Sequence, residues 1–227
     1  MATISATPVQ QANNNSFSGT TATIAISPTT TGNTVIIGVS SQAVAVLSIA
    51  GAGVTTFTSR KTVTNAVNGR AEIWSGVVTA GASTSIVVTF VGSADGTVWM
   101  DERAGINTTT PVDSSSSGFD ATGSAVLVDP GSITPTAGID CLIVAVGSCQ
   151  SSTRNPAGDP TGFTPYTNGG WGGRFMAAYQ KVASASGSYD PTWTCNYDRM
   201  AAVVVAFKAA TGGGGQVPPI SRGIFLS

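Results

Sequence analysis

The chain of 227 residues contains no histidine and only two glutamates, Glu72 and Glu102, and these absences narrow its chemistry. Without histidine, the usual general base is missing, so Ser-His-Asp and Cys-His catalysis are excluded. A glycosidase needs paired carboxylates, and two glutamates offer little support for one. Glu72 lies two positions from Arg70 on an expected strand, which predicts a same-face ion pair. We therefore expect no catalytic residues and no enzymatic activity.

Charge and long apolar runs are also scarce. Only 9% of residues are charged and the formal net charge is -1, with ten scattered Lys and Arg, so the cationic face that nucleic-acid binding needs is missing. Few charges leave little protection against self-association, which favours a homo-oligomer, with a trimer as one option. No apolar run approaches the roughly 18 residues of a membrane span, and residues 1–5 do not resemble a secretory signal. We expect a soluble protein made in a host cytoplasm.

The three cysteines predict neither a metal site nor a cofactor. Cys141 and Cys149 lie on one expected strand, where they would be roughly 26 Å apart, too far to pair. Cys195 could meet either of them across strands, and that pairing stays open. Without metal-ligand spacing, the three cysteines are most typical of small buried apolar residues.

Short runs of β-forming residues separated by Gly, Ser, Thr and Asn predict an all-β protein without helices. Alternating or continuous apolar runs mark the expected strands. In the first half these are residues 20–27, 34–40, 44–49, 54–58, 71–78, 85–91 and 97–103. In the second half they are residues 125–128, 140–148, 163–166, 174–182, 191–196 and 200–208.

The two halves of the chain resemble each other. Residues 31–40 are echoed by residues 137–146, and residues 69–74 by residues 173–179, in the same order. Fixed-order self-similarity indicates a duplicated structural unit.

The duplication predicts a jelly-roll-like double-sheet β-sandwich over residues 17–210. We place the pseudo-repeats at about 17–105 and 123–210, and expect both halves to contribute strands to both sheets. Residues 1–16 would form an N-terminal arm, and the Ser-rich residues 111–123 a crossover between the halves.

The last residues differ in composition from the rest. Residues 211–215 form a Gly-rich linker, and residues 216–227 carry apolar side chains that a solvated end does not need. We interpret residues 211–227 as a linker and a docking tail that binds a partner. The alternative is a tail that folds back on its own sandwich or frays. The expected docking residues are Pro218, Pro219, Ile220, Arg222, Ile224, Phe225 and Leu226.

One acidic motif follows an expected strand. Asp101 and Arg103 point to the same strand face, which predicts a surface ion pair, while Gly105 and Pro111 shape the turn that follows. The alternative is a Ca²⁺ site built from Asp101, Asp113 and loop carbonyls. The ion pair is the preferred interpretation, because two acids are too few for a convincing calcium site.

A glycine-framed aromatic residue suggests a binding loop. Trp171 is flanked by glycines and could present its ring to a sugar or a partner, with Tyr166 and Tyr197 beside it. The alternative is that Trp171 covers the core as a lid. The other tryptophans alternate with apolar residues and are expected in the core or at a sheet rim: Trp74, Trp99 and Trp193.

Two further segments accompany the duplication. One is the motif at residues 101–113, which contains a Thr-Thr-Pro-Val-Asp turn. The other is the segment 193–195, which precedes a closing strand that ends at Lys208. Together they resemble a β-sandwich family that recurs in tailed-phage virion proteins and bacterial surface proteins. The resemblance covers most of residues 17–209. It implies a sandwich fold and a virion or surface setting, and it brings no catalytic residues.

Two functions remain. The first is a structural protein of a phage virion, a capsid decoration or cement protein or another head or tail accessory subunit. Its partners would be major capsid or neck and tail subunits. The second is a carbohydrate-binding adhesin or receptor-binding module that recognises a surface glycan. The low charge and the apolar tail favour the first, and the Trp171 loop favours the second.

Overall fold

The computed structural model describes residues 3–65, 69–81, 83–149, 160–170 and 175–210, and within them the chain is all-β. The strands are β1 (Gln10–Ala25), β2 (Thr34–Ser41), β3 (Val46–Gly51), β4 (Thr58–Thr64), β5 (Arg70–Val77), β6 (Ser85–Arg103), β7 (Val112–Val128), β8 (Cys141–Cys149), β9 (Thr164–Gly170), β10 (Phe175–Val182) and β11 (Trp193–Lys208). Among the described residues, no helix is long and apolar enough to cross a membrane.

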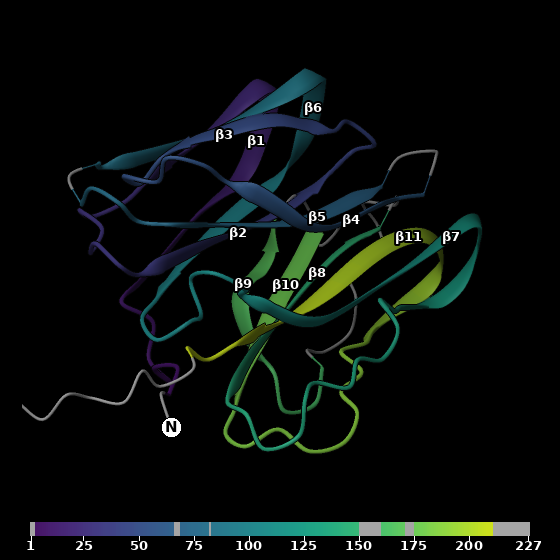
Figure 1. Ribbon diagram of the computed structural model, residues 1–227. Helices are drawn as coiled ribbons and strands as arrows, with labels where there is room; N and C mark the ends of the chain where they lie inside the picture. The colour runs from purple at the N-terminus through teal and green to yellow at the C-terminus, as the bar shows by residue number, and fades with distance from the viewer. Residues whose placement is uncertain (1–2, 66–68, 82, 150–159, 171–174, 211–227) are drawn as a thin grey trace, which may run out of the picture.

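Two antiparallel sheets pack face to face, which confirms the double-sheet sandwich (Figure 1). The first has the order β1-β6-β2-β5-β4, with β3 also paired to β6, and the second has the order β7-β11-β8-β10-β9. The two orders match strand for strand. Ile37 pairs with Met100, and 106 residues later in both cases Ile143 pairs with Ala206. The duplication seen in the sequence is therefore repeated in the strand pairing.

Each repeat forms one whole sheet, so the expectation that both halves supply strands to both sheets is wrong. The reason is that every named strand pairs with strands of its own repeat, and the two sheets contact each other through their faces. Jelly-roll exchange of strands between the sheets is absent among the described residues.

The repeat boundaries also differ from the expected ones. The Ser-rich residues 111–123 were expected to be a crossover, but β7 begins at Val112 and pairs with β11 over most of its length. Residues 10–16, expected in an N-terminal arm, belong to β1 and pair with β6. Strand pairing with a distant apolar partner overrides the weak local propensity of these polar stretches.

The central strands β2 and β8 are buried on both faces, which explains their continuous apolar runs. In β2, Ile37 faces the core of its own repeat and Ile36 faces the other sheet. In β8, Ile143 likewise faces the core of its own repeat, and Leu142 faces the other sheet. The described residues therefore form three apolar clusters: one within each repeat, and one between the sheets, called here the inter-sheet core.

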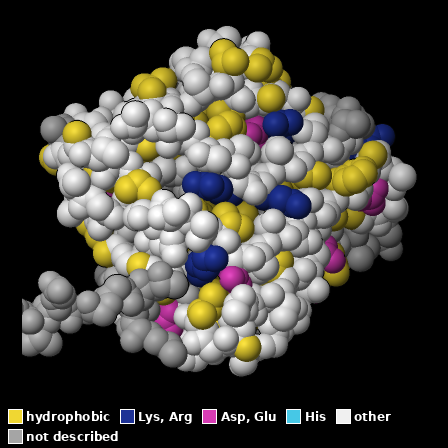
Figure 2. Space-filling model, in the orientation of Figure 1, with side chains coloured by type: hydrophobic (Ala, Val, Ile, Leu, Met, Phe, Trp, Pro, Cys, Tyr) yellow, Lys and Arg dark blue, Asp and Glu magenta, His cyan; other side chains and the backbone are white. Residues whose placement is uncertain are grey.

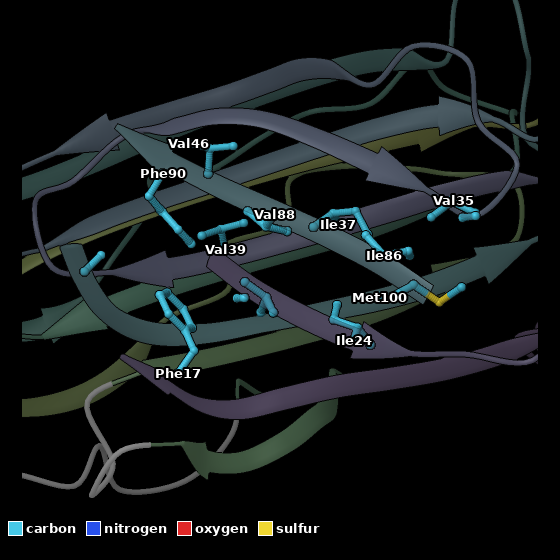
Figure 3. Packing of buried hydrophobic residues seen from close by; sticks show 14 of the residues in the cluster. Phe17, Ile24, Val35, Ile37, Val39, Val46, Ile86, Val88, Phe90 and Met100 are labelled. Carbon is cyan, nitrogen blue, oxygen red and sulfur yellow. The ribbon is translucent and has the colours of Figure 1, made fainter. Parts of the chain in front are cut away.

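The core of the first repeat forms because β6 is long enough to pair with two different strands, β3 and β2, along its length. Its first half pairs with β3, where Val46 lies opposite Phe90, and its second half pairs with β2. Figure 3 shows side chains of β1, β2, β3 and β6 converging in this core. The rings of Phe17 and Phe90 stack there with centroids 4.8 Å apart.

An expected strand at 54–58 is replaced by β4, which begins at Thr58.

The tryptophan prediction is confirmed, because Trp99 and Trp193 are each only 2% exposed and Trp74 packs against the core of the first repeat. Cys141 and Cys149 lie buried at the two ends of β8, as expected. The side chain of Cys195 lies outside the described residues, so its pairing stays open.

Candidate functional site

A buried polar cluster joins the two sheets beside the inter-sheet core. Asp101 and Arg103 lie two positions apart on β6, and the Arg103 Nε donates to both Asp101 carboxylate oxygens at 2.9 and 2.8 Å. The ion pair predicted from the sequence is present, but its surface location is wrong, since Asp101 is 2% and Arg103 0% exposed. It is buried because this face of β6 is turned toward the second sheet.

The second repeat contributes two tyrosines to the cluster. The Tyr166 hydroxyl on β9 donates to Asp101 Oδ2 at 2.9 Å. The Arg103 guanidinium carbon lies 4.6 Å from the ring centroid of Tyr179 on β10, and the two tyrosine rings are 4.7 Å apart. A cation over an aromatic face is attracted to it, so Arg103 interacts favourably with both sheets.

The N-terminal segment completes the cluster. Arg103 Nη1 donates to the carbonyls of Ser5 at 3.2 Å and Ala6 at 2.8 Å. Ile4, only 2% exposed, packs into the inter-sheet core. Residues 4–6 are therefore fixed to the body and do not form an arm that is available to a partner.

The electrostatics of the cluster stabilise particular protonation states. Burial raises the pKa of Tyr166 well above its usual value, and the nearby Asp101 carboxylate raises it further. Burial also raises the pKa of Asp101, although Arg103 opposes this change. Burial lowers the pKa of Arg103, but the attraction of Asp101 and the contributions of Tyr166 and Tyr179 together outweigh it, so the net change is upward. Tyr166 thus stays protonated and Arg103 stays charged.

The cluster leaves no room for a substrate. The neighbouring cavity, lined in part by Trp99, Asp101 and Tyr166, has a volume of about 10 Å³. That is about the space of one water molecule. The cluster therefore acts as a polar connection between the repeats.

The two glutamates also have structural partners. Glu72 is 1% exposed and accepts from Arg70 Nε, from Trp74 Nε1 at 2.9 Å and from the Val46 amide at 3.0 Å. The predicted Arg70–Glu72 pair is confirmed. Glu102, which is fully buried, accepts from side chains and an amide of its own repeat. Both carboxylates are occupied by hydrogen bonds that hold loops to strands.

The two ends of the described chain meet at one end of the sandwich, called here the terminal pole (Figure 1). The Ala210 amide donates to the Gly105 carbonyl at 2.8 Å, and the Ser5 amide donates to the Ala104 carbonyl at 3.3 Å. Gly105 has a φ of 86°, and a Cβ there would lie 2.2 Å from the Thr3 carbonyl oxygen. Only glycine allows the three chain segments to approach this closely.

An open hollow of about 600 Å³ lies at the terminal pole. It is lined by Asn107, Thr108, Thr109, Thr110, Asp113, Thr136, Ile139, Lys208, Ala209 and Ala210. Asn107 Oδ1 accepts from two following amides and so shapes the threonine loop. Asp113 accepts from the Thr136 amide at 2.5 Å and from its hydroxyl at 3.0 Å. The hollow combines hydroxyl groups, one carboxylate and one ammonium with a few apolar walls.

The structure separates the residues of the proposed calcium site. Asp101 accepts from Arg103 and Tyr166, whereas Asp113 accepts from Thr136. Within the described ranges, no group of three or more His, Cys, Asp or Glu could hold a metal ion. The carboxylates of this motif have structural partners of different kinds.

Of the three expected ligand-binding aromatic residues, Tyr166 is the one whose side chain is described, and its hydroxyl is bonded to Asp101 inside the protein. Trp171 lies outside the described residues, and so does the side chain of Tyr197 on β11. The expected docking tail, residues 211–227, also lies outside them. Sequence reasoning missed Tyr179 as a member of the polar cluster, since no local pattern marks a partner on another sheet.

The exposed surface is sparsely charged. Figure 2 shows one face on which a few Lys and Arg side chains lie separately, some of them beside an acidic side chain, on a mostly uncharged surface. Comparison of the chain with protein-family models, with curated proteins and with solved structures found no match.

Proposed function

We propose that this protein is a non-enzymatic structural protein of a phage virion, a capsid decoration or cement protein or a head accessory protein. It is held on the particle by its terminal pole. The observation that carries the proposal is the meeting of both chain ends at that pole, through the Ala210–Gly105 and Ser5–Ala104 hydrogen bonds. One attachment end leaves the rest of the sandwich free to stand on the particle.

The composition of the chain beyond this pole supports attachment there. A Gly-rich linker starts at residue 211, and the apolar residues Ile220, Ile224, Phe225 and Leu226 follow it. Once the body lies near a partner, the tether holds these apolar side chains at a high effective concentration at the partner's surface, which favours their binding. The partners in this proposal are major capsid or neck and tail subunits. N-terminal attachment is less well supported, because Ile4 is buried in the body.

The internal hydrogen bonds of the body suit a structural role. Its buried ionisable groups Glu72, Asp101, Glu102 and Arg103 are occupied by internal hydrogen bonds. The alternative of a glycan-binding module has weaker support, because the Tyr166 hydroxyl is bonded to Asp101 and is not directed to a ligand.

Particle incorporation tests the proposal. A tagged full chain would be produced in cells infected with the phage that encodes it, beside a variant that ends at Gly212. A matched control would keep the length of the tail and replace residues 216–227 with Gly and Ser. We expect the full chain in purified particles and both variants to be strongly depleted. Undiminished incorporation of the truncated chain would refute attachment by the tail.

A further inference from the structure

The two repeats end differently at corresponding positions. In the first repeat, Glu102 lies 106 residues before Lys208 and is fully buried. It accepts from Gln10 Nε2 at 2.7 Å, from the Thr30 amide at 2.8 Å and from Asn33 Nδ2 at 2.7 Å. These bonds close this end of the first repeat with groups of the same repeat.

The corresponding end of the second repeat is open. Lys208 takes the place of Glu102, and it lines the hollow of about 600 Å³ at the terminal pole. Within the described part of the chain, Lys208 forms no ion pair. Asp113 accepts two hydrogen bonds from Thr136, while a carboxylate offers about four acceptor positions. The hollow can therefore still accept a cation at Asp113, beside apolar walls formed by Ile139 and Ala209.

One segment of this chain has the matching chemistry. In residues 218–226, Arg222 stands between Ile220 and Ile224, two positions from each. In a β-strand conformation such residues point to the same side, and the preceding proline pair disfavours a helix at the start of the segment. One face would then present an arginine flanked by two apolar side chains, which complements a carboxylate flanked by apolar walls.

We propose that the hollow binds residues 218–226 of a second copy of this chain, with Arg222 paired to Asp113. This inference rests on the proposed function, in which the tail docks on a neighbour, and it names that neighbour. Ala209 and Ala210 lie in the wall of the hollow. The low charge of the chain favours self-association, so we assign the hollow to the tail of a second copy. The seven residues 211–217, which join the body to this segment, reach at most about 25 Å, so the terminal poles of the two copies must be adjacent.

Such a contact is head-to-tail, because the tail of one copy enters the hollow of the next. Contacts of this kind generate rings when the rotation closes. A ring of copies with their terminal poles on one side would face a capsid lattice together. The second repeat would thus be closed by another molecule, where the first repeat is closed by its own Glu102 network.

Charge exchange tests the pairing in the full chain. Sedimentation velocity and equilibrium would be measured for wild type, Asp113→Lys, Arg222→Glu and the double variant. We expect each single change to weaken self-association at least about tenfold, and the double variant to return to within about threefold of wild type. Asp95→Lys, near the middle of β6 and away from the hollow, is the matched control and should associate like wild type. A thermal unfolding scan of each variant would confirm that the body is folded.

Three results would overturn the inference: a monomeric full chain at about 100 µM, single variants that associate like wild type, or a double variant that is not restored. A variant with both Asp113→Cys and Arg222→Cys would show by crosslinking whether the tail binds within one chain or between chains. Exclusively intramolecular crosslinks would also overturn the inference. If the tail is required for incorporation into particles while the full chain is monomeric, this inference fails and the proposed function stands. If the truncated chain enters particles normally, the proposed tail attachment fails.

Discussion

The substitution Asp101→Asn tests whether the buried ion pair holds the two sheets together. The change keeps the size of the side chain and removes its charge. Arg103, which is 0% exposed, would then be a buried cation beside neutral groups: the Tyr166 hydroxyl, the Tyr179 ring and two carbonyls. Removal of one partner of a buried pair is strongly destabilising, because the other charge remains desolvated.

The expected loss is about 3–5 kcal/mol of unfolding free energy, the range for breaking such pairs. Domains are stable by about 5–15 kcal/mol, so this loss is a large part of the total. For a chain of this size, it corresponds to a fall in Tm of roughly 6–20 °C. The double variant Asp101→Asn with Arg103→Met should cost about 2 kcal/mol less than the sum of the single changes, because it leaves no unpaired buried charge.

Urea unfolding followed by circular dichroism and tryptophan fluorescence would measure these values. Coincident transitions with the two probes would show that a single unfolding free energy applies. Asp120→Asn is a suitable control, because Asp120 is a partly exposed residue of β7 that accepts hydrogen bonds from the hydroxyls of Thr122 and Ser124. Its effect should be much smaller. An Asp101→Asn loss below about 1 kcal/mol, or strictly additive single and double variants, would refute the reasoning.

Two further predictions concern the same region. Ile4→Ala should cost about 2–5 kcal/mol in urea unfolding, because Ile4 is buried in the inter-sheet core, whereas a change of less than about 0.5 kcal/mol would indicate a free arm. At high pH, Tyr166 has a folded-state pKa well above its usual value of 10, so its contribution to stability is complete below pH 10 and is lost as the pH rises through the folded-state pKa. In a pH titration followed by absorbance at 295 nm, one fraction of the tyrosine signal should therefore rise only when the circular dichroism of the fold is lost. The substitution Tyr166→Phe should remove that fraction of the absorbance change. Ionisation of all four tyrosines near pH 10 in an intact fold would contradict the assignment.

Local patterns in the sequence were sufficient for several features of the fold. The apolar runs at residues 34–40 and 140–148 predicted strands, and the structure shows them as β2 and β8, each buried on both faces. The spacing of Asp101 and Arg103 predicted a pair, since residues two apart share a strand face. The echo between the halves predicted two similar units, and the strand orders agree with it.

Other features depended on contacts between distant segments. The Ser-rich stretch became β7 because β11 supplies its hydrogen-bonding partner, which no local pattern shows. Tyr166 and Tyr179 approach Arg103 only after the two sheets have packed together. For the same reason, the sequence could not show that Tyr166 faces inward.

The amino-acid sequence by itself thus determined the β class, many of the strands and the duplicated order, because strand periodicity and composition are properties of a few consecutive residues. Only the tertiary structure decided which strands are central, that each repeat forms its own sheet, that the Asp101–Arg103 pair is buried and that the two ends of the described chain meet near Gly105. These features depend on which faces and edges meet. That choice is made by the free energy of packing the whole chain, to which residues far apart in the sequence contribute together.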